Sequence, residues 1–221
     1  MIAEELITDS IPPVKPTDPA SLTLDWMGEF KLGQLPIVQD RQYLGIVRES
    51  DILDAADPDV PVSEIRYAGF DGAYVMPHSH FYEIVDVMTA FNLEVLPVLD
   101  EEKRYLGMIT LRDLLQFLRV LFAVSDPGGV LVLEIPPRSY MLSEVGRIAE
   151  SADAKVLSLY LAQTPGTDTF LLTLKLNVED LSRLIAAFER FDYKVIRAYH
   201  RARFADNYDR NLQALLRWLE M

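Results

Sequence analysis

The sequence predicts an α+β protein built from two parts, and three observations lead to this prediction. Residues 14–53 and 75–115 repeat one another, and each copy combines short apolar runs with helical spacing. Residues 130–199 then show a different order of segments, β-α-β-β-α-β. Between the two lies the turn-rich run Asp126-Pro127-Gly128-Gly129, which is typical of a domain boundary. We therefore expect a repeated module over residues 1–124, a second domain over 129–200 and a C-terminal helix in 201–221.

The internal repeat consists of identical residues in a constant register. At an offset of 61 the identical pairs are Val14/Val75, Pro16/Pro77, Asp25/Asp86, Met27/Met88, Phe30/Phe91, Leu32/Leu93, Leu35/Leu96 and Pro36/Pro97. After one inserted residue in a polar turn the offset becomes 62, and the pairs are Tyr43/Tyr105, Leu44/Leu106, Gly45/Gly107, Asp51/Asp113 and Leu53/Leu115. This period is longer than that of solenoid repeats, so each copy is a half-domain. The copies should span about residues 1–62 and 63–124.

Each copy has the order β-α-β-β-α. A short β-like segment ends at Pro16 or Pro77, and a helix follows; in the second copy the helix carries Ile84, Met88 and Phe91 at helical spacing. Two strands joined by a polar turn come next, and then a second helix that begins near Ser50 or Leu111. The expected strands are Leu35–Val38 and Tyr43–Val47 in the first copy, and Val95–Leu99 and Tyr105–Ile109 in the second.

These residues resemble the tandem CBS (cystathionine β-synthase type) module. The resemblance is carried by two corresponding sets of runs: Leu35-Pro36-Ile37-Val38, Tyr43-Leu44-Gly45-Ile46-Val47 and Asp51-Ile52-Leu53, then Leu96-Pro97-Val98-Leu99, Tyr105-Leu106-Gly107-Met108-Ile109-Thr110 and Asp113-Leu114-Leu115. It covers about residues 1–124. Two copies at matched spacing make the resemblance specific.

The order of the segments in the C-terminal part predicts a ferredoxin-like domain. Its expected elements, in order, are strand Val130–Ile135, helix Leu142–Ser151, strands Val156–Ala162 and Phe170–Leu176, helix Val178–Phe191 and strand Lys194–Tyr199. After a CBS module this order resembles an ACT-like domain, and the whole chain resembles CBS–ACT proteins of the acetoin-utilisation type. A last helix, Asp206–Leu219, has Leu212 and Leu216 on its apolar side, which would pack on the sheet or contact a second copy.

The resemblance implies that the second-copy run around Gly107-Met108-Ile109 binds an adenosine-containing ligand. Glycine permits a close approach of the backbone, and a helix N-terminus attracts phosphate. By position, Thr110 would meet phosphate or ribose, and Asp113 would accept hydrogen bonds from the ribose hydroxyls. Thr-x-x-Asp at a helix start is also a capping-box pattern, with Thr110 as the N-cap, so a structural role stays open.

The first copy departs from the family pattern. It keeps Gly45 and Asp51 but has Arg48 where threonine is expected. Arg48 could pair with a phosphate, or it could fill the site and pair with an acid. The ACT-like part also departs, because the segment Ile135–Leu142 lacks the glycine of that family's ligand loop. Self-pairing is therefore the more expected use of that domain.

Composition narrows the classes of partner. Lys plus Arg is 21 and Asp plus Glu is 34, so the formal net charge is −13. Such a surface repels phosphate backbones and anionic lipid, so neither nucleic acid nor a membrane is expected as a partner. The chain has no cysteine, which excludes thiol catalysis, thiolate metal sites and disulfides. The start lacks the basic region of a signal peptide, and the longest apolar stretch is too short for a bilayer, so a cytoplasmic protein is expected.

No motif for catalysis or for a metal site is found. We therefore expect a regulatory protein, not an enzyme, that requires no cofactor and binds AMP, ADP, ATP or S-adenosylmethionine between its two CBS copies. By resemblance the protein would form a homodimer and act on a regulated protein partner. The alternative is a dimeric interaction protein that senses nothing and whose nucleotide cleft is vestigial.

Overall fold

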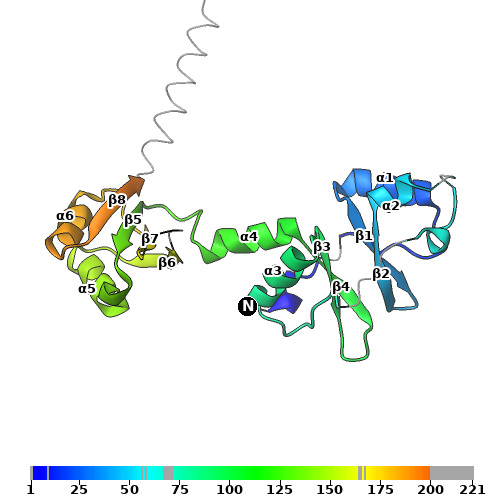
Figure 1. Ribbon diagram of the computed structural model, residues 1–221, viewed down its shortest axis with the longest axis horizontal. Helices are drawn as coiled ribbons and strands as arrows, with labels where there is room; N and C mark the ends of the chain where they lie inside the picture. The colour runs from blue at the N-terminus through cyan, green and yellow to red at the C-terminus, as the bar shows by residue number, and fades with distance from the viewer. Residues whose placement is uncertain are drawn as a thin grey trace, which may run out of the picture. The chain divides into compact units, whose positions relative to one another are not determined.

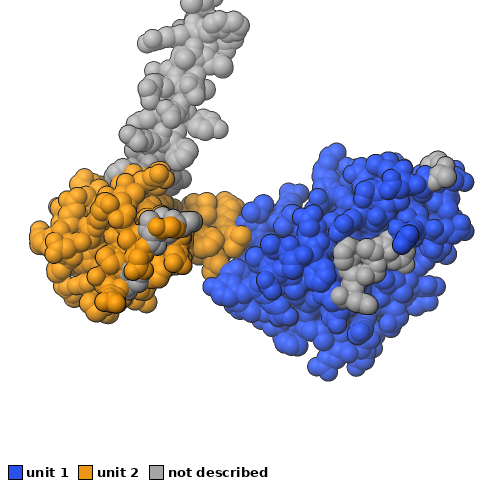
Figure 2. Space-filling model, in the orientation of Figure 1, with its two compact units in different colours: residues 1–117 blue, residues 118–221 orange. Residues whose placement is uncertain are grey.

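The computed structural model describes residues 2–8, 10–55, 57, 59–66, 72–163, 166 and 168–199. These residues form two compact units, residues 1–117 and residues 118–221 (Figure 2). The division falls within a helix, α4, which spans Leu111–Leu121. The turn-rich run at residues 126–129 follows that helix, and the exact limits of the domains stay a prediction.

The first unit contains two halves of similar construction (Figure 1). The first half has the short 3-10 helix η1 (Ala3–Leu6), then α1 (Ala20–Phe30), strands β1 (Gln34–Gln39) and β2 (Gln42–Arg48), α2 (Glu49–Leu53) and η2 (Val62–Glu64). The second half has α3 (Phe81–Ala90), β3 (Val95–Leu99), β4 (Tyr105–Thr110) and α4. Each half has one antiparallel strand pair, β1–β2 or β3–β4. The strands lie within one or two residues of their predicted positions.

The opening β-like segment of each half is shorter than expected. Val14 makes a single parallel bridge with Ile37, and Val75 makes the corresponding bridge with Val98. Prolines follow two residues later in both copies, at Pro16 and Pro77. Because proline has no N–H to donate, the ladder stops after one bridge.

Apolar side chains on both strand pairs explain why the halves fold as they do. All of β3 is buried, and so is β1 except for its last residue. The first half packs Met27 of α1 and Ile52 of α2 against Leu35 and Ile37 of β1. A strand buried on both faces needs a continuous apolar run, which is what both Leu-Pro-Ile/Val-Val/Leu segments provide.

Polar side chains join the two halves within the first unit. The Gly33 N–H donates to Glu94 Oε2 at 2.7 Å. The Gln34 amide donates to the Asn92 carbonyl at 3.1 Å and accepts from the Glu94 N–H at the same distance. The end of α1 is therefore held beside the segment that leads into β3, and this contact builds the candidate site.

The second unit is a four-stranded antiparallel sheet with the strand order β6-β7-β5-β8. Its elements are β5 (Val130–Ile135), η3 (Pro137–Ser139), α5 (Leu142–Ser151), β6 (Val156–Gln163), β7 (Phe170–Leu176), α6 (Ser182–Arg190) and β8 (Lys194–Tyr199). Alternate residues of β5 and β7 enter the core, where they meet Ile148 of α5 and Phe188 of α6. Period-2 burial of this kind is typical of a sheet with one covered face.

The two remaining helix predictions for the C-terminal part have different outcomes. The helix predicted over 178–191 begins only at Ser182, because the Val178 carbonyl accepts from the Gly129 N–H at 2.7 Å and Asp180 accepts from the Ser182 N–H at 2.9 Å. These bonds form a turn where the apolar spacing alone predicts helix. The helix predicted over 206–219 lies outside the described residues.

Candidate functional site

Thr110 and Asp113 meet where β4 ends and α4 begins. The Thr110 N–H donates to Asp113 Oδ2 at 3.0 Å, and the Asp113 N–H donates to Thr110 Oγ1 at 3.2 Å. The Thr110 hydroxyl also donates to Asp113 Oδ2 at 2.6 Å. This reciprocal arrangement is a capping box, with aspartate in the place of the usual glutamate. Both of these bonds to the Asp113 carboxylate end on Oδ2, so Oδ1 can still accept from a ligand.

A cleft of about 710 Å³ lies in front of this capping box. Its lining comes from three places in the first unit: the N-terminal segment with Thr8, Ser10 and Ile11; the end of α1 with Glu29, Phe30, Lys31 and Leu32; and the junction with Glu94, Thr110, Leu111, Arg112, Asp113 and Gln116. The volume lies within the range of about 300–1,000 Å³ that is usual for small-molecule sites. The cleft can therefore hold a molecule of nucleotide size.

The chemistry of the lining is mixed in a way that suits a nucleotide. Ile11, Phe30 and Leu32 provide apolar surface for a base. Lys31 and Arg112 are the cations of the lining, and Arg112 lies in the first turn of α4, where free N–H groups also favour phosphate. Among the acids of the lining, Glu94 is already engaged by the Gly33 N–H. Sequence reasoning identified Thr110 and Asp113 but missed Phe30 and Lys31.

The other predicted residues of the second copy do not line this cleft. Met108 and Ile109 are fully buried. A Cβ atom on Gly107 would lie 2.4 Å from Ile7 Cγ2, and the Thr8 N–H donates to the Met108 carbonyl at 2.9 Å. The close approach that glycine permits is thus made by the chain's own N-terminal segment. A contact of these residues with a ligand stays a prediction.

Arg48 and Asp51 of the first copy lie away from the 710 Å³ cleft. The Arg48 N–H donates to Asp51 Oδ2 at 3.0 Å, but arginine has no acceptor, so only one half of the capping box can form. The Arg48 guanidinium reaches into the second half, where Nη2 donates to the Phe91 carbonyl at 3.4 Å. Asp51 lines a separate cavity of about 400 Å³.

The second unit has a small cavity of about 150 Å³ beside the segment predicted as the ACT-like ligand loop. Pro136 and Ser139 line it together with Glu144 and Tyr193. The Tyr193 hydroxyl donates to Glu144 Oε2 at 2.8 Å, and burial together with this carboxylate raises the pKa of Tyr193 to about 12. The phenol therefore stays neutral at physiological pH and serves as a donor within the fold.

Two further observations concern the described residues alone. No helix among them is long and apolar enough to cross a bilayer, and no three His, Cys, Asp or Glu side chains among them converge as metal ligands would. In the run His78-Ser79-His80, His80 is the N-cap of α3, where its Nδ1 accepts from the Tyr82 N–H at 3.3 Å.

Comparison with known proteins agrees with the repeat. A family model for the CBS domain matches residues 3–58 and 71–120. The inosine-5'-monophosphate dehydrogenase of Methanocaldococcus jannaschii is 27% identical over 132 residues, which cover 59% of this chain and 26% of that protein. The magnesium transporter MgtE of Thermus thermophilus is 31% identical over 105 residues, 48% of this chain and 22% of that protein. The chain thus spans about a quarter of the length of the curated relatives it matches.

Among solved structures, a putative acetoin utilization protein from Vibrio cholerae matches with a TM-score of 0.49 and 22% identity. That match covers 57% of this chain and 95% of the other.

Proposed function

Because residues 3–58 and 71–120 of this chain form a tandem pair of CBS domains, we propose that the protein has a regulatory role. In this role it binds an adenosine nucleotide in the cleft at Thr110 and Asp113. The CBS pair is typically a regulatory rather than a catalytic fold. The observation that supports the proposal most is that Asp113 lines a nucleotide-sized cleft while its hydrogen bonds within the fold use only Oδ2. In this role Asp113 accepts from the ribose hydroxyls, while Lys31 and the start of α4 attract phosphate.

The mechanism would be a ligand-linked change of shape. The cleft takes residues from both CBS halves, so a ligand that contacts α1 and α4 together stabilises one arrangement of the halves over others. The second unit, which we propose is an ACT-like domain, or a protein partner would respond to that arrangement. Its loop without glycine and its cavity of about 150 Å³ favour pairing over ligand binding.

A thermal-shift panel with ATP, ADP, AMP and S-adenosylmethionine tests this function. A ligand at about 100 times its dissociation constant stabilises the folded state by roughly 2.7 kcal/mol, or on the order of 5 °C for a chain of this size. We expect this shift with one or more adenosine nucleotides, and none with the Thr110→Ala/Asp113→Ala double variant. A flat panel at millimolar ligand would contradict the proposal.

One observation favours the alternative of an interaction protein with a vestigial cleft. Thr110 and Asp113 satisfy one another, and Ile7 covers Gly107, so these residues also have a purely structural explanation. A flat panel combined with a stable dimer would support this second function.

We propose in either case that the protein is a homodimer. Leu53 of α2 and Leu115 of α4 occupy the same position in the two repeats, and both are about two-thirds exposed, at 67% and 66%. Equivalent apolar residues on two related helices suit a twofold contact with a second copy. Light scattering should give twice the mass of one chain, and Leu53→Glu/Leu115→Glu should give a monomer. A wild-type mass of one chain at every concentration would rule out this pairing.

A further inference from the structure

We propose that the CBS pair takes one ligand per chain, because the Arg48 side chain fills the half-site of the first repeat. This inference rests on the proposed function of the Thr110–Asp113 cleft. It chooses between the two roles that the sequence leaves open for Arg48, which are to meet a ligand phosphate or to occupy the site itself.

The repeat register places Arg48 where the second copy has Thr110, and Phe91 where the first copy has Phe30. In the second half-site, Thr110 and Phe30 both line the open cleft. In the first half-site, the guanidinium of Arg48 donates to the carbonyl of Phe91. An arginine side chain therefore crosses the space that, at the equivalent position, stays open for a ligand.

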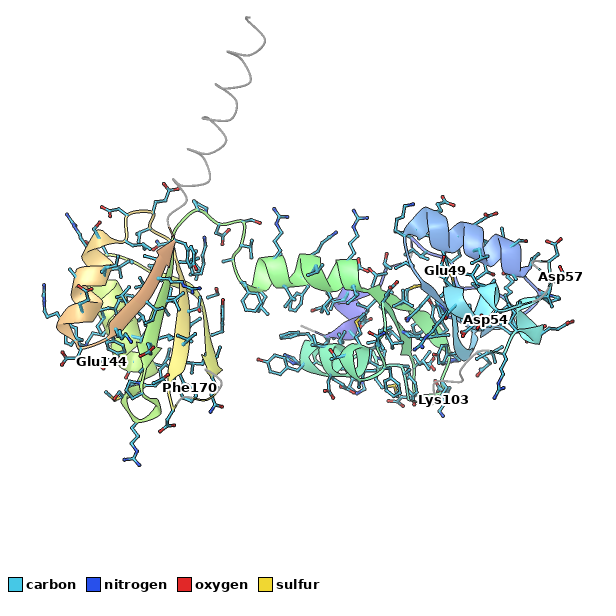
Figure 3. All side chains as sticks on the ribbon, turned by 45° about the horizontal axis from the view of Figure 1, so that its top comes forward. Glu49, Asp54, Asp57, Lys103, Glu144 and Phe170 are labelled. Atoms are coloured by element: carbon cyan, nitrogen blue, oxygen red, sulfur yellow. The ribbon has the colours of Figure 1, made fainter. Side chains whose placement is uncertain are left out.

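The chemistry of the first half-site also differs from that of a phosphate or ribose site. Threonine can donate and accept, whereas arginine can only donate, so the capping box that presents Asp113 has no full counterpart at Asp51. Asp51 also lines the separate cavity of about 400 Å³, which includes neither Arg48 nor Phe91 and which carries the acids Asp54, Asp57 and Glu64 beside the cation Arg66. Figure 3 shows Asp54 at the end of α2. This local charge repels a phosphate group.

The two half-sites thus differ in the space that they leave for a ligand and in the position of their cations. The second repeat offers an open cleft with Lys31 and Arg112, and the first repeat contains its own cation, bonded to the backbone at the end of α3. The consequence is a stoichiometry of one nucleotide per chain and a single affinity.

Isothermal titration of the full chain with ATP, and separately with AMP, measures this stoichiometry. We expect one site per chain. A second experiment places an arginine at the equivalent position of the other repeat. Thr110→Arg should lower the affinity for the nucleotide more than about 100-fold, because the new side chain occupies the cleft. Thr110→Ala is the matched control, since it removes the same cap and hydroxyl but leaves the space open, and it should cost at most about tenfold.

The outcomes separate the two proposals. Two sites per chain, or equal affinities for Thr110→Arg and Thr110→Ala, would overturn the inference and leave the proposed function standing. If neither nucleotide binds to the wild-type chain, the proposed function is contradicted, and so is the single-site inference. Circular dichroism of both variants shows whether they remain folded; the first repeat already carries arginine at this position beside a helix.

Discussion

Asp113→Ala should lower nucleotide affinity by about 10- to 100-fold, and Asp51→Ala should leave it within about twofold of wild type. Hydrogen bonds to a charged group contribute about 1.5–3 kcal/mol, and about 1.4 kcal/mol corresponds to a factor of ten. The Asp113 carboxylate lines the cleft, so Asp113→Ala removes the bonds that this group makes to the ligand and to Thr110. Titration of the two variants with ATP and AMP measures the difference.

Asp51 is a close control because both aspartates accept the same backbone hydrogen bond at the start of a helix. Each accepts from the backbone N–H of the residue three positions before it, at 3.0 Å in both repeats. Each variant should therefore lose about 1 kcal/mol of helix-capping stability, which thermal unfolding can verify. Equal weakening of binding in the two variants would show that the loss comes from stability and not from contact with the ligand.

Gly128→Ala should destabilise the second unit by on the order of 3 kcal/mol or prevent its folding. Gly128 has a φ of +135°, and a Cβ atom there would lie 1.8 Å from the Leu176 carbonyl oxygen. That oxygen belongs to the backbone of β7, next to the residues that pair with the start of β5, so it cannot move aside without breaking the sheet. Denaturant unfolding followed by circular dichroism provides the measurement.

Two other glycine variants make this prediction falsifiable even if Gly128→Ala does not fold. The atoms nearest to a Cβ atom on Gly129 belong to the Leu181 side chain, at 2.7–2.9 Å. A side chain can adjust more easily than the backbone of a sheet, so Gly129→Ala should cost less than Gly128→Ala. Gly146 lies within α5 with open space around it, and Gly146→Ala should stabilise the protein by about 0.5–1 kcal/mol. Any other rank order of the three variants would contradict the geometry.

The strands could be predicted closely from the sequence, for a physical reason. Strands such as Val130–Ile135 and Phe170–Leu176 are apolar runs bounded by turn residues, and both occur as predicted. The start of α6 could not be predicted, because the Val178 carbonyl is used by Gly129, a distant residue in the chain. The repeat also predicted where Thr110 and Asp113 lie, since a threonine followed by an aspartate three residues later is a local signal for a helix start.

The rest of the cleft depends on tertiary contacts that no local pattern contains. Phe30 and Lys31 line it because Gly33, which follows α1, donates its N–H to Glu94 in the other half of the pair. Gly107 fits the expected motif, but Ile7 already fills the space in front of it. Lys31 and its repeat counterpart Asn92 share a left-handed backbone at a helix end, with φ of 58° and 51°, and this similarity is visible only in the structure.

Hydrogen exchange with and without saturating ATP or AMP tests the central claim most directly, because it locates the ligand on the chain. We predict slower exchange at residues 29–32 and 110–116, two of the segments that line the cleft. The first half-site, residues 48–54 and 91–93, should exchange at unchanged rates. Unchanged exchange throughout the CBS pair, or protection confined to residues 48–54 and 91–93, would contradict the assignment of the ligand to Thr110 and Asp113.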